Sequence, residues 1–379
     1  MDFTPLNTAR SIKFGNNGKL KIMHVTDTHM EDENINYTLV LIARACDNEK
    51  PDIVIVTGDN VFNYDDSTKT KKYIGRFMKI FDERNIPVAI TFGNHDSERG
   101  PLSRRELMEF YNTFDCSVTN ENGKELAESG TYNIPVLSSN GNEMKYNLWV
   151  FDSGDYDDEG HYGCVSAEDV EWYKKKSDLI TKENGKKIYS LAFQHIIVPE
   201  VYDVLKKVNK HRLYSFSHMY NKDDYYMFDP SQVNFGTLNE TPCCGFPNYG
   251  QFEAMVEKGD VLGVFTGHDH TNAFGVKCKG IDIVNSLSTR FNGDRFSTMY
   301  GYRILEIDEN DTSVYTSYIK RWYNMYSKQD IKDLKTNADA FTVKTAVAVT
   351  RKGRNQRFMT AVGRGFTKLV TGRQVTYND

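Results

Sequence analysis

Five short stretches of this sequence combine histidine, aspartate and asparagine in patterns that could hold metal ions. They are Asp27-Thr28-His29, Gly58-Asp59-Asn60, Gly93-Asn94-His95-Asp96, Gln194-His195 and Gly267-His268-Asp269-His270. Carboxylate, imidazole and amide oxygen ligands suit borderline divalent or trivalent metals. The six cysteines show no CxxC spacing, so a thiolate zinc site is not expected. We therefore interpret the five stretches as candidate metal ligands.

Each of these stretches follows a short apolar run, as in "KIMHV", "DIVIVT", "PVAITF", "YSLAF" and "VLGVFT". Continuous apolar runs are typical of strands buried on both faces. Helical patterns over 37–49 and 69–84 separate the first three runs, which predicts βαβ units and an α/β fold. Residues that follow the strands of such a sheet converge on one crevice, so we expect the five stretches to meet there.

The number of candidate ligands favours two metal ions. A single ion takes four to six ligands, whereas two ions about 3.5 to 4 Å apart form the clamp used in phosphoryl displacement. A pair requires a bridging carboxylate, and Asp59 fits this role between Gly58 and Asn60 at the end of its apolar run. A glycine also precedes Asn94 and His268, which indicates tight turns or a close backbone approach to the ions. The seven candidate ligands are Asp27, His29, Asp59, Asn94, His195, His268 and His270.

In order and spacing, this set resembles the calcineurin-like metallophosphoesterase superfamily over residues 19–320. The stretches "LWVFDSG", "EDVEWY", "FQHIIVPE" and "GHDHTN" further resemble the phosphatase branch similar to the purple acid phosphatases. The resemblance implies an α/β fold in which a β-sandwich of two mixed sheets is flanked by helices. These make four layers, α/β/β/α, with the site at the carboxyl ends of the strands.

The resemblance also implies a role for each ligand and two bound ions, which could be Mn, Fe or Zn. One ion would be held by Asp27, His29 and His270, the other by Asn94, His195 and His268, and both by Asp59.

His95 would not be a ligand according to the resemblance. It would donate to a phosphate oxygen or protonate the leaving group, with Asp96 fixing its orientation. Purple acid phosphatases have a tyrosine ligand three residues after the bridging aspartate and a glycine in place of the first histidine. This sequence has Phe62 and His29 at those positions, so a coloured tyrosinate–iron site is not expected.

These residues predict an enzyme that hydrolyses a small phosphomonoester or phosphodiester. Two cations would offset the phosphate charge, and a hydroxide formed from the water held between them would attack in line. A non-catalytic interaction module on the same fold is the alternative. The complete ligand set together with His95 favours the enzyme.

Composition also bears on the binding partners and the cellular compartment of the protein. The net charge of −5 over 379 residues gives no positive field for nucleic acid. No apolar run approaches the roughly 18 residues of a membrane helix, and the N-terminal residues do not match a secretory signal. With cysteines that form no disulfide pattern, this predicts a cytoplasmic protein.

We divide the chain into an N-terminal extension (1–18), a catalytic domain (19–326) and a basic C-terminal tail (327–379). An aromatic-rich insertion over 205–250 either lines a substrate pocket or packs on itself. The tail has eight Lys and Arg from Lys344 onward against one acid, Asp379. Its glycines weaken a helix, so a solvated or docked tail is favoured over contact with an acidic membrane. The sequence does not define an oligomeric state.

Overall fold

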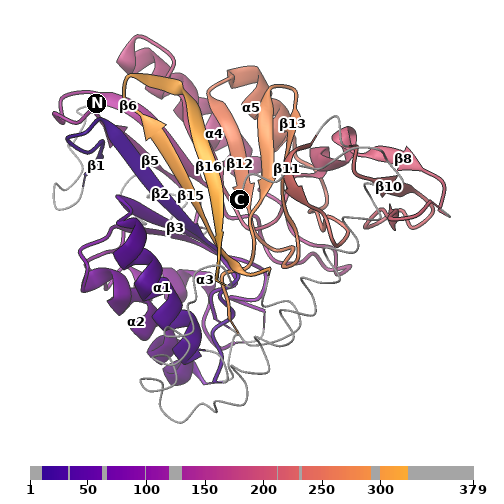
Figure 1. Cartoon of the computed structure of the whole chain (residues 1–379), viewed down its shortest axis with the longest axis horizontal. Helices are drawn as coiled ribbons and strands as arrows, with labels where there is room; N and C mark the ends of the chain where they lie inside the picture. Colours follow the sequence, from indigo (N-terminus) through magenta and orange to yellow (C-terminus); the bar gives the residue numbers. More distant parts are fainter. Residues whose placement is uncertain are drawn as a thin grey trace.

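Two mixed β-sheets stack face to face at the centre of the molecule (Figure 1). The structure, a computed structural model, describes residues 11–32, 35–61, 66–98, 100–118, 130–210, 212–229, 233–291 and 299–322. Phe62 and the basic tail lie outside these residues, as do residues 1–10 of the predicted N-terminal extension.

The smaller of the two sheets has five strands in the order β16-β15-β2-β3-β4. Strands β2, β3 and β4 are parallel, β15 runs antiparallel to β2, and β16 runs antiparallel to β15. Every residue of β3 and β4 is buried, as the continuous apolar runs predict. The strands are β2 (Lys19–Val25), β3 (Ile53–Thr57), β4 (Val88–Thr91), β15 (Gly301–Asp308) and β16 (Asp311–Arg321).

The larger sheet has eight strands in the order β1-β5-β6-β7-β12-β14-β13-β11. Its central strands β6, β7, β12 and β14 are parallel, whereas β5 and β13 are antiparallel to their central neighbours. The strands are β1 (Ile12–Lys13), β5 (Tyr132–Leu137), β6 (Met144–Val150), β7 (Ser190–Phe193), β11 (Val233–Thr237), β12 (Val261–Thr266), β13 (Ala273–Cys278) and β14 (Ile281–Asn285).

Three apolar clusters show that the layers are helix, sheet, sheet and helix. One joins the first three helices to the five-stranded sheet, and a second joins the last two helices to the eight-stranded sheet. The third fills the space between the sheets, with Ile22 and Ile55 on one side and Leu191 and Phe265 on the other. The predicted four-layer fold is therefore confirmed. The helices are α1 (Ile35–Glu49), α2 (Ser67–Asp82), α3 (Arg104–Tyr111), α4 (Ala167–Asn184) and α5 (Gln251–Lys258), with a 3₁₀ helix at Pro199–Val204.

Side-chain caps fix where two of these helices begin. Ser103 and Glu106 form a reciprocal capping box at the start of α3, and the Ser166 hydroxyl accepts the Asp169 N–H at the start of α4. Such caps satisfy backbone N–H groups that have no partner within the helix. Arg104, the first residue of α3, donates to the Gly93 carbonyl oxygen at 3.1 Å, so the start of this helix contacts the turn after β4.

The N-terminal part of the described chain and the insertion are more regular than the sequence-based division indicates. Strand β1 pairs with β5, so residues 12–13 of the predicted extension belong to the larger sheet. The insertion is also partly regular. It contains β8 (Lys206–Val208), β9 (Phe216–Ser217) and β10 (Tyr225–Met227), which form a small sheet that projects from the body (Figure 1). Its last strand, β11, pairs with β13.

Within the described part of the chain, no helix combines the length and apolar character needed to cross a membrane. All six cysteines lie in that part, and no disulfide bond forms among them.

Candidate metal centre

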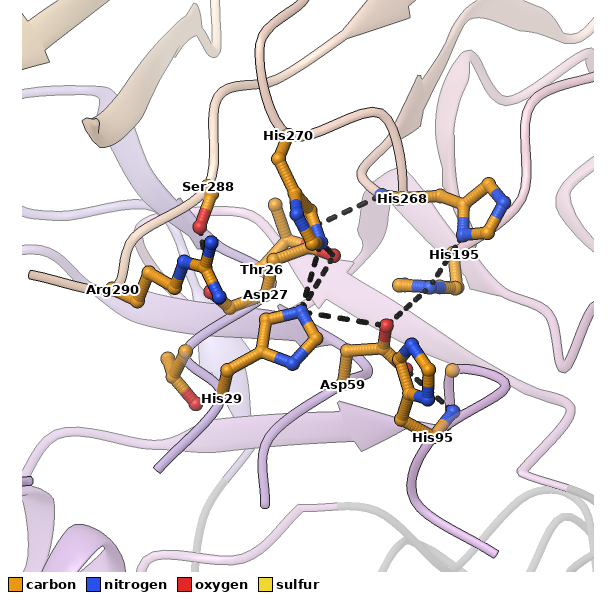
Figure 2. A network of polar contacts seen from close by, with 12 residues as sticks. Thr26, Asp27, His29, Asp59, His95, His195, His268, His270, Ser288 and Arg290 are labelled. Carbon is orange, nitrogen blue, oxygen red and sulfur yellow. Dashed lines mark hydrogen bonds and ion pairs between the residues drawn. The ribbon is translucent and has the colours of Figure 1, made fainter. Parts of the chain in front are cut away.

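Five parallel strands from both sheets end at one place and bring the predicted ligands together. The turns after β2, β3 and β4 supply Asp27, His29, Asp59 and Asn94, and those after β7 and β12 supply His195, His268 and His270. Figure 2 shows these side chains, except Asn94, pointing toward a common centre. The two sheets contribute to one site because their parallel strands end on the same side of the sandwich.

The first group of side chains consists of Asp27, His29, Asp59 and His270, whose ligand atoms lie within 4.8 Å of one another. The Nε2 atoms of His29 and His270 are 2.9 Å apart. Asp27 Oδ1 lies 3.3 Å from His270 Nε2 and 3.6 Å from His29 Nε2. Two carboxylates and two imidazoles at these separations form a donor set for one cation.

The second group consists of Asp59, Asn94, His195 and His268. His195 Nε2 lies 3.2 Å from Asp59 Oδ2, 3.2 Å from Asn94 Oδ1 and 3.3 Å from His268 Nδ1. The other His195 nitrogen, Nδ1, lies 2.7 Å from the Thr57 carbonyl oxygen, to which it can donate. That hydrogen bond leaves Nε2 to face the group, which is how a ligand histidine is commonly oriented.

Asp59 belongs to both groups. Its Oδ1 accepts the His95 backbone N–H at 2.8 Å, and its Oδ2 lies 3.6 Å from His29 Nε2 as well as 3.2 Å from His195 Nε2. Oδ2 of Asp59 and Oδ1 of Asp27 are buried and accept no well-directed hydrogen bond from the described residues. Buried carboxylate oxygens without such partners are costly unless a cation binds them, so the donor set fits two metal ions.

Four of the candidate ligands have a positive φ angle, a backbone conformation that residues other than glycine rarely adopt. The φ angles are 52° at Asp27, 39° at His29, 51° at Asp59 and 69° at His268. Hydrogen bonds between neighbouring turns hold this geometry, with Asp27 N donating to Gly58 O and His29 N to Asp59 O. Such conformations cost about 1 kcal/mol or more each, and they concentrate at functional sites.

Two of the glycines noted in the sequence are needed because ligands pack against them. A Cβ on Gly93 would lie 2.2 Å from Asp59 Oδ1, and one on Gly267 would lie 2.4 Å from Asp27 Oδ2. The close approach predicted for these glycines is therefore to the ligand carboxylates.

Charge within the site shifts the pKa values of its members. Burial lowers the pKa of His29 to about 4 and that of His268 to about 3. Burial also acts to lower the pKa of His195, but the Asp59 and Asp27 carboxylates outweigh it and raise this pKa to about 9. Burial would raise the pKa of Asp27, yet the nearby histidines hold it well below its ordinary value. The metal-free site therefore pairs ionised carboxylates with a protonated His195.

Asp96 does not contact His95, contrary to the expectation from the sequence. Its carboxylate accepts backbone N–H groups of Asp59 at 2.7 Å, Gly93 at 2.8 Å and Asn60 at 2.9 Å. It thus ties the second ligand turn to the third. The carboxylate next to His95 Nδ1 belongs to Glu98, three residues further along the chain. Asp96 therefore joins two turns, and Glu98 is the acid that faces the His95 ring.

Sequence reasoning also missed two tyrosines beside the second group. The Tyr156 hydroxyl accepts Asn94 Nδ2 at 2.8 Å, and the Tyr162 ring lies 4.3 Å from the His268 ring, centroid to centroid. Both come from the loop after β6, which is parallel to β7. The apolar run "NLWVF" before this loop could have predicted a strand that ends at the same edge of the sheet as the other strands of the site.

Asp269 lies behind the ligands, where it accepts the Cys243 N–H at 3.2 Å and Asn272 Nδ2 at 3.1 Å. Its Cys243 partner belongs to the insertion, so this carboxylate joins the insertion to the last ligand turn. This position is consistent with a role for Asp269 in supporting the ligand turn.

A family model described as calcineurin-like phosphoesterase matches residues 20–272. Two Arabidopsis thaliana proteins are similar in sequence. "Probable inactive purple acid phosphatase 29" is 26% identical over 310 residues, which cover 72% of each chain. "Probable inactive purple acid phosphatase 14" is 24% identical over 320 residues, 75% of this chain and 74% of the relative. These findings agree with the resemblance predicted from the motifs.

Two further proteins are similar over different lengths. "Phosphatase DCR2" of Saccharomyces cerevisiae is 25% identical over 230 residues, 54% of this chain and 39% of that protein. A solved dimetal phosphatase from Danio rerio aligns over 79% of this chain and 98% of its own, with 12% identity and a TM-score of 0.48.

Proposed function

Because the chain belongs to the calcineurin-like phosphoesterase family, we propose that it hydrolyses a small phosphomonoester or phosphodiester with two bound metal ions. The observation that supports this most directly is the position of Asp59. One of its oxygens faces ring nitrogens of both ligand groups, and its other oxygen holds the His95 backbone. The carboxylate therefore links two cation sites to a histidine that can transfer a proton.

Two bound divalent or trivalent ions, of Mn, Fe or Zn, would offset the phosphate charge and lower the pKa of the attacking water. Asp27, His29 and His270 would hold one ion, Asn94, His195 and His268 the other, and Asp59 both. The Thr57 carbonyl and the Asp27 contacts keep these ligands in place before any ion binds. Little rearrangement is then needed on binding.

His95 stands beside the ligands as the proton donor in this proposal. Its ring centroid is 5.5 Å from that of His29, and its side chain is 29% exposed, whereas His29 is 1% exposed. A substrate can therefore reach His95. The Glu98 carboxylate contacts Nδ1 and holds the ring. In this proposal Nε2 is the atom that protonates the leaving-group oxygen. As the bond from phosphorus to that oxygen breaks, water forms the new bond and His95 supplies the proton.

A non-catalytic interaction module on the same fold is the second candidate. It is favoured by the names of the two Arabidopsis relatives, both of which contain the words "probable inactive". For this chain, the seven ligands and His95 support the enzyme. We propose a small-molecule substrate and no nucleic-acid partner, since the net charge is −5.

The test is hydrolysis of p-nitrophenyl phosphate and bis-p-nitrophenyl phosphate by manganese-loaded protein. Asp59→Asn and a chelated sample are the inactive references. Asp308→Asn is the matched control, because Asp308 pairs with exposed Lys19 away from the site. We expect turnover by the wild type and Asp308→Asn, and at least about a 10³-fold lower rate for Asp59→Asn. Equal rates for the wild type and Asp59→Asn would exclude the two-metal mechanism.

A further inference from the structure

A pair of tyrosine rings lines the second ligand group on the side of His95. The Tyr156 and Tyr162 ring centroids are 5.4 Å apart, with an interplanar angle of 33°. Tyr156 contacts Asn94, the residue before His95, and Tyr162 packs edge-on against His268. Both side chains are only partly buried. The two rings therefore place aromatic surface beside the turn that carries Asn94 and His95.

The insertion holds the main chain of Tyr162 in place. Tyr162 N donates to the Tyr220 hydroxyl at 3.2 Å, and Phe246 N donates to the Tyr162 carbonyl at 2.9 Å. Tyr220, Phe246 and His161 form a further ring cluster, with centroids between 5.0 and 5.8 Å apart. Phe246 is 51% exposed, so apolar surface continues outward from Tyr162. Rings fixed by backbone contacts lose little entropy when they bind a planar ligand.

The loop that carries the tyrosines is acidic. Its sequence from Asp155 to Glu159 is "DYDDE". Asp155 lies 3.3 Å from Ser97 Oγ, which places the start of this loop beside the turn of His95 and Glu98. The nearby cation, Arg104, already contacts Asp152 and lies 3.9 Å from Asp155. The carboxylates of this loop would therefore repel a second phosphate or a carboxylate on the part of the substrate that lies over the loop.

From these contacts we infer that the substrate is a phosphate ester whose leaving group is an aromatic ring without negative charge. The inference rests on the proposed hydrolysis, and it adds the chemical class of the leaving group. Water forms the new bond to phosphorus, and the bond from phosphorus to the phenolic oxygen breaks. His95 supplies the proton that converts this oxygen to the free phenol. The tyrosines bind the ring and take no part in proton transfer.

The first experiment compares an aryl ester with an alkyl ester. Tyr162→Ala is expected to lower kcat/KM for phenyl phosphate roughly three- to tenfold and to change that for trifluoroethyl phosphate less than about twofold. Tyr214→Ala is the matched control, since Tyr214 is 57% exposed and lies in the insertion. An equal fall for both esters would overturn the inference, because it would mean that Tyr162 acts by positioning His268.

The second experiment tests the charge. Wild-type kcat/KM for para-carboxyphenyl phosphate should be severalfold below that for phenyl phosphate at low salt, and the gap should narrow with added salt. The double variant Asp158→Asn, Glu159→Gln should also reduce the difference in kcat/KM between the two esters. A wild type that hydrolyses both esters equally would contradict the charge part of the inference.

A binding measurement separates this inference from the proposed hydrolysis. With manganese-loaded protein, phenylphosphonate should bind roughly three- to tenfold more tightly than methylphosphonate, and Tyr162→Ala should remove that difference. This result without any turnover would retain the aromatic subsite and reject hydrolysis. Turnover of both ester types with equal phosphonate binding would retain hydrolysis and reject the subsite.

Discussion

The two ligand groups share Asp59 but differ in charge. The first contains a carboxylate of its own, Asp27, whereas the second adds the neutral amide of Asn94. The Asp27 carboxylate also has its other oxygen, Oδ2, anchored by Thr26 Oγ1 at 2.7 Å and by the His268 N–H at 3.0 Å. The groups therefore resemble each other in donor number but not in electrostatics.

The difference in charge predicts that the first group binds its ion more tightly than the second. An additional fixed negative charge strengthens cation binding in a buried site, where screening by water is weak. Competition with a proton does not separate the groups, because burial is outweighed by nearby carboxylates at one histidine of each and the pKa is raised at both His195 and His270. We therefore expect the first group to fill at lower metal concentration.

The largest effect should come from removing a ligand of one group only. His268→Ala is expected to keep one tightly bound manganese per chain and to lower kcat about 10³-fold or more, since the second ion is lost. His270→Ala should remove the tight binding step instead. Metal content after dialysis, together with calorimetric titration, measures both.

His218→Ala controls for loss of a histidine elsewhere, because His218 lies in the insertion among Tyr202, Tyr220 and Tyr226. If His268→Ala and His270→Ala lost the same binding step, the difference between the groups would be refuted.

A smaller effect should distinguish the two acids near His95. Glu98→Gln is expected to lower kcat roughly tenfold with little change in melting temperature, because it loosens the His95 ring. Asp96→Asn should instead lower the free energy of unfolding by about 2 kcal/mol or more, since an amide cannot accept all of the backbone N–H groups that the carboxylate now accepts. Denaturant titrations and initial rates on the same preparations measure both effects.

The acids of the His95 turn offer an internal check. Glu98→Asp should recover part of the activity lost in Glu98→Gln if the carboxylate orients the ring. A Glu98→Gln variant with full kcat would show that the His95 contact has no part in turnover.

The smallest effect concerns pH and the metal-free protein. The folded-state pKa of His195 is about 9, above its ordinary value of 6.5, so its stabilising contribution is complete below 6.5 and is lost as pH rises through about 9. Melting temperature of chelated protein should therefore fall between these pH values. Over the same interval metal affinity should rise, because the ion and the proton compete for Nε2.

His195→Asn removes the titrating group and serves as the reference for this window. An equal fall of melting temperature in the variant would assign the pH dependence to other residues.

Much of the fold and of the centre was predictable because local patterns encode them. The runs that became β3 and β4 are continuous and apolar, which is typical of strands buried on both faces. The ligands follow such runs directly, and parallel strands place their carboxyl ends together. The shared position of Asp59 and the close approach of Gly93 were therefore open to sequence reasoning.

The prediction about Asp96 failed because spacing along the chain does not reveal which donors reach a carboxylate in the folded protein. Asp96 follows His95 directly, which suggested that it orients the ring. In the folded chain the main-chain N–H groups of Asp59 and Asn60, in the turn after β3, donate to its two oxygens. Glu98 contacts His95 instead, since the turn brings the third residue back toward the ring.

The residue types of the candidate ligands, the glycines beside them and the apolar strands before them could be read from the sequence, because strand burial and turn geometry depend on neighbouring residues. The acid that faces His95, and the position of Tyr156 and Tyr162 beside the second group, became apparent only in the folded chain. Contacts between turns depend on which strands pair and on how the two sheets pack, and no local pattern records either.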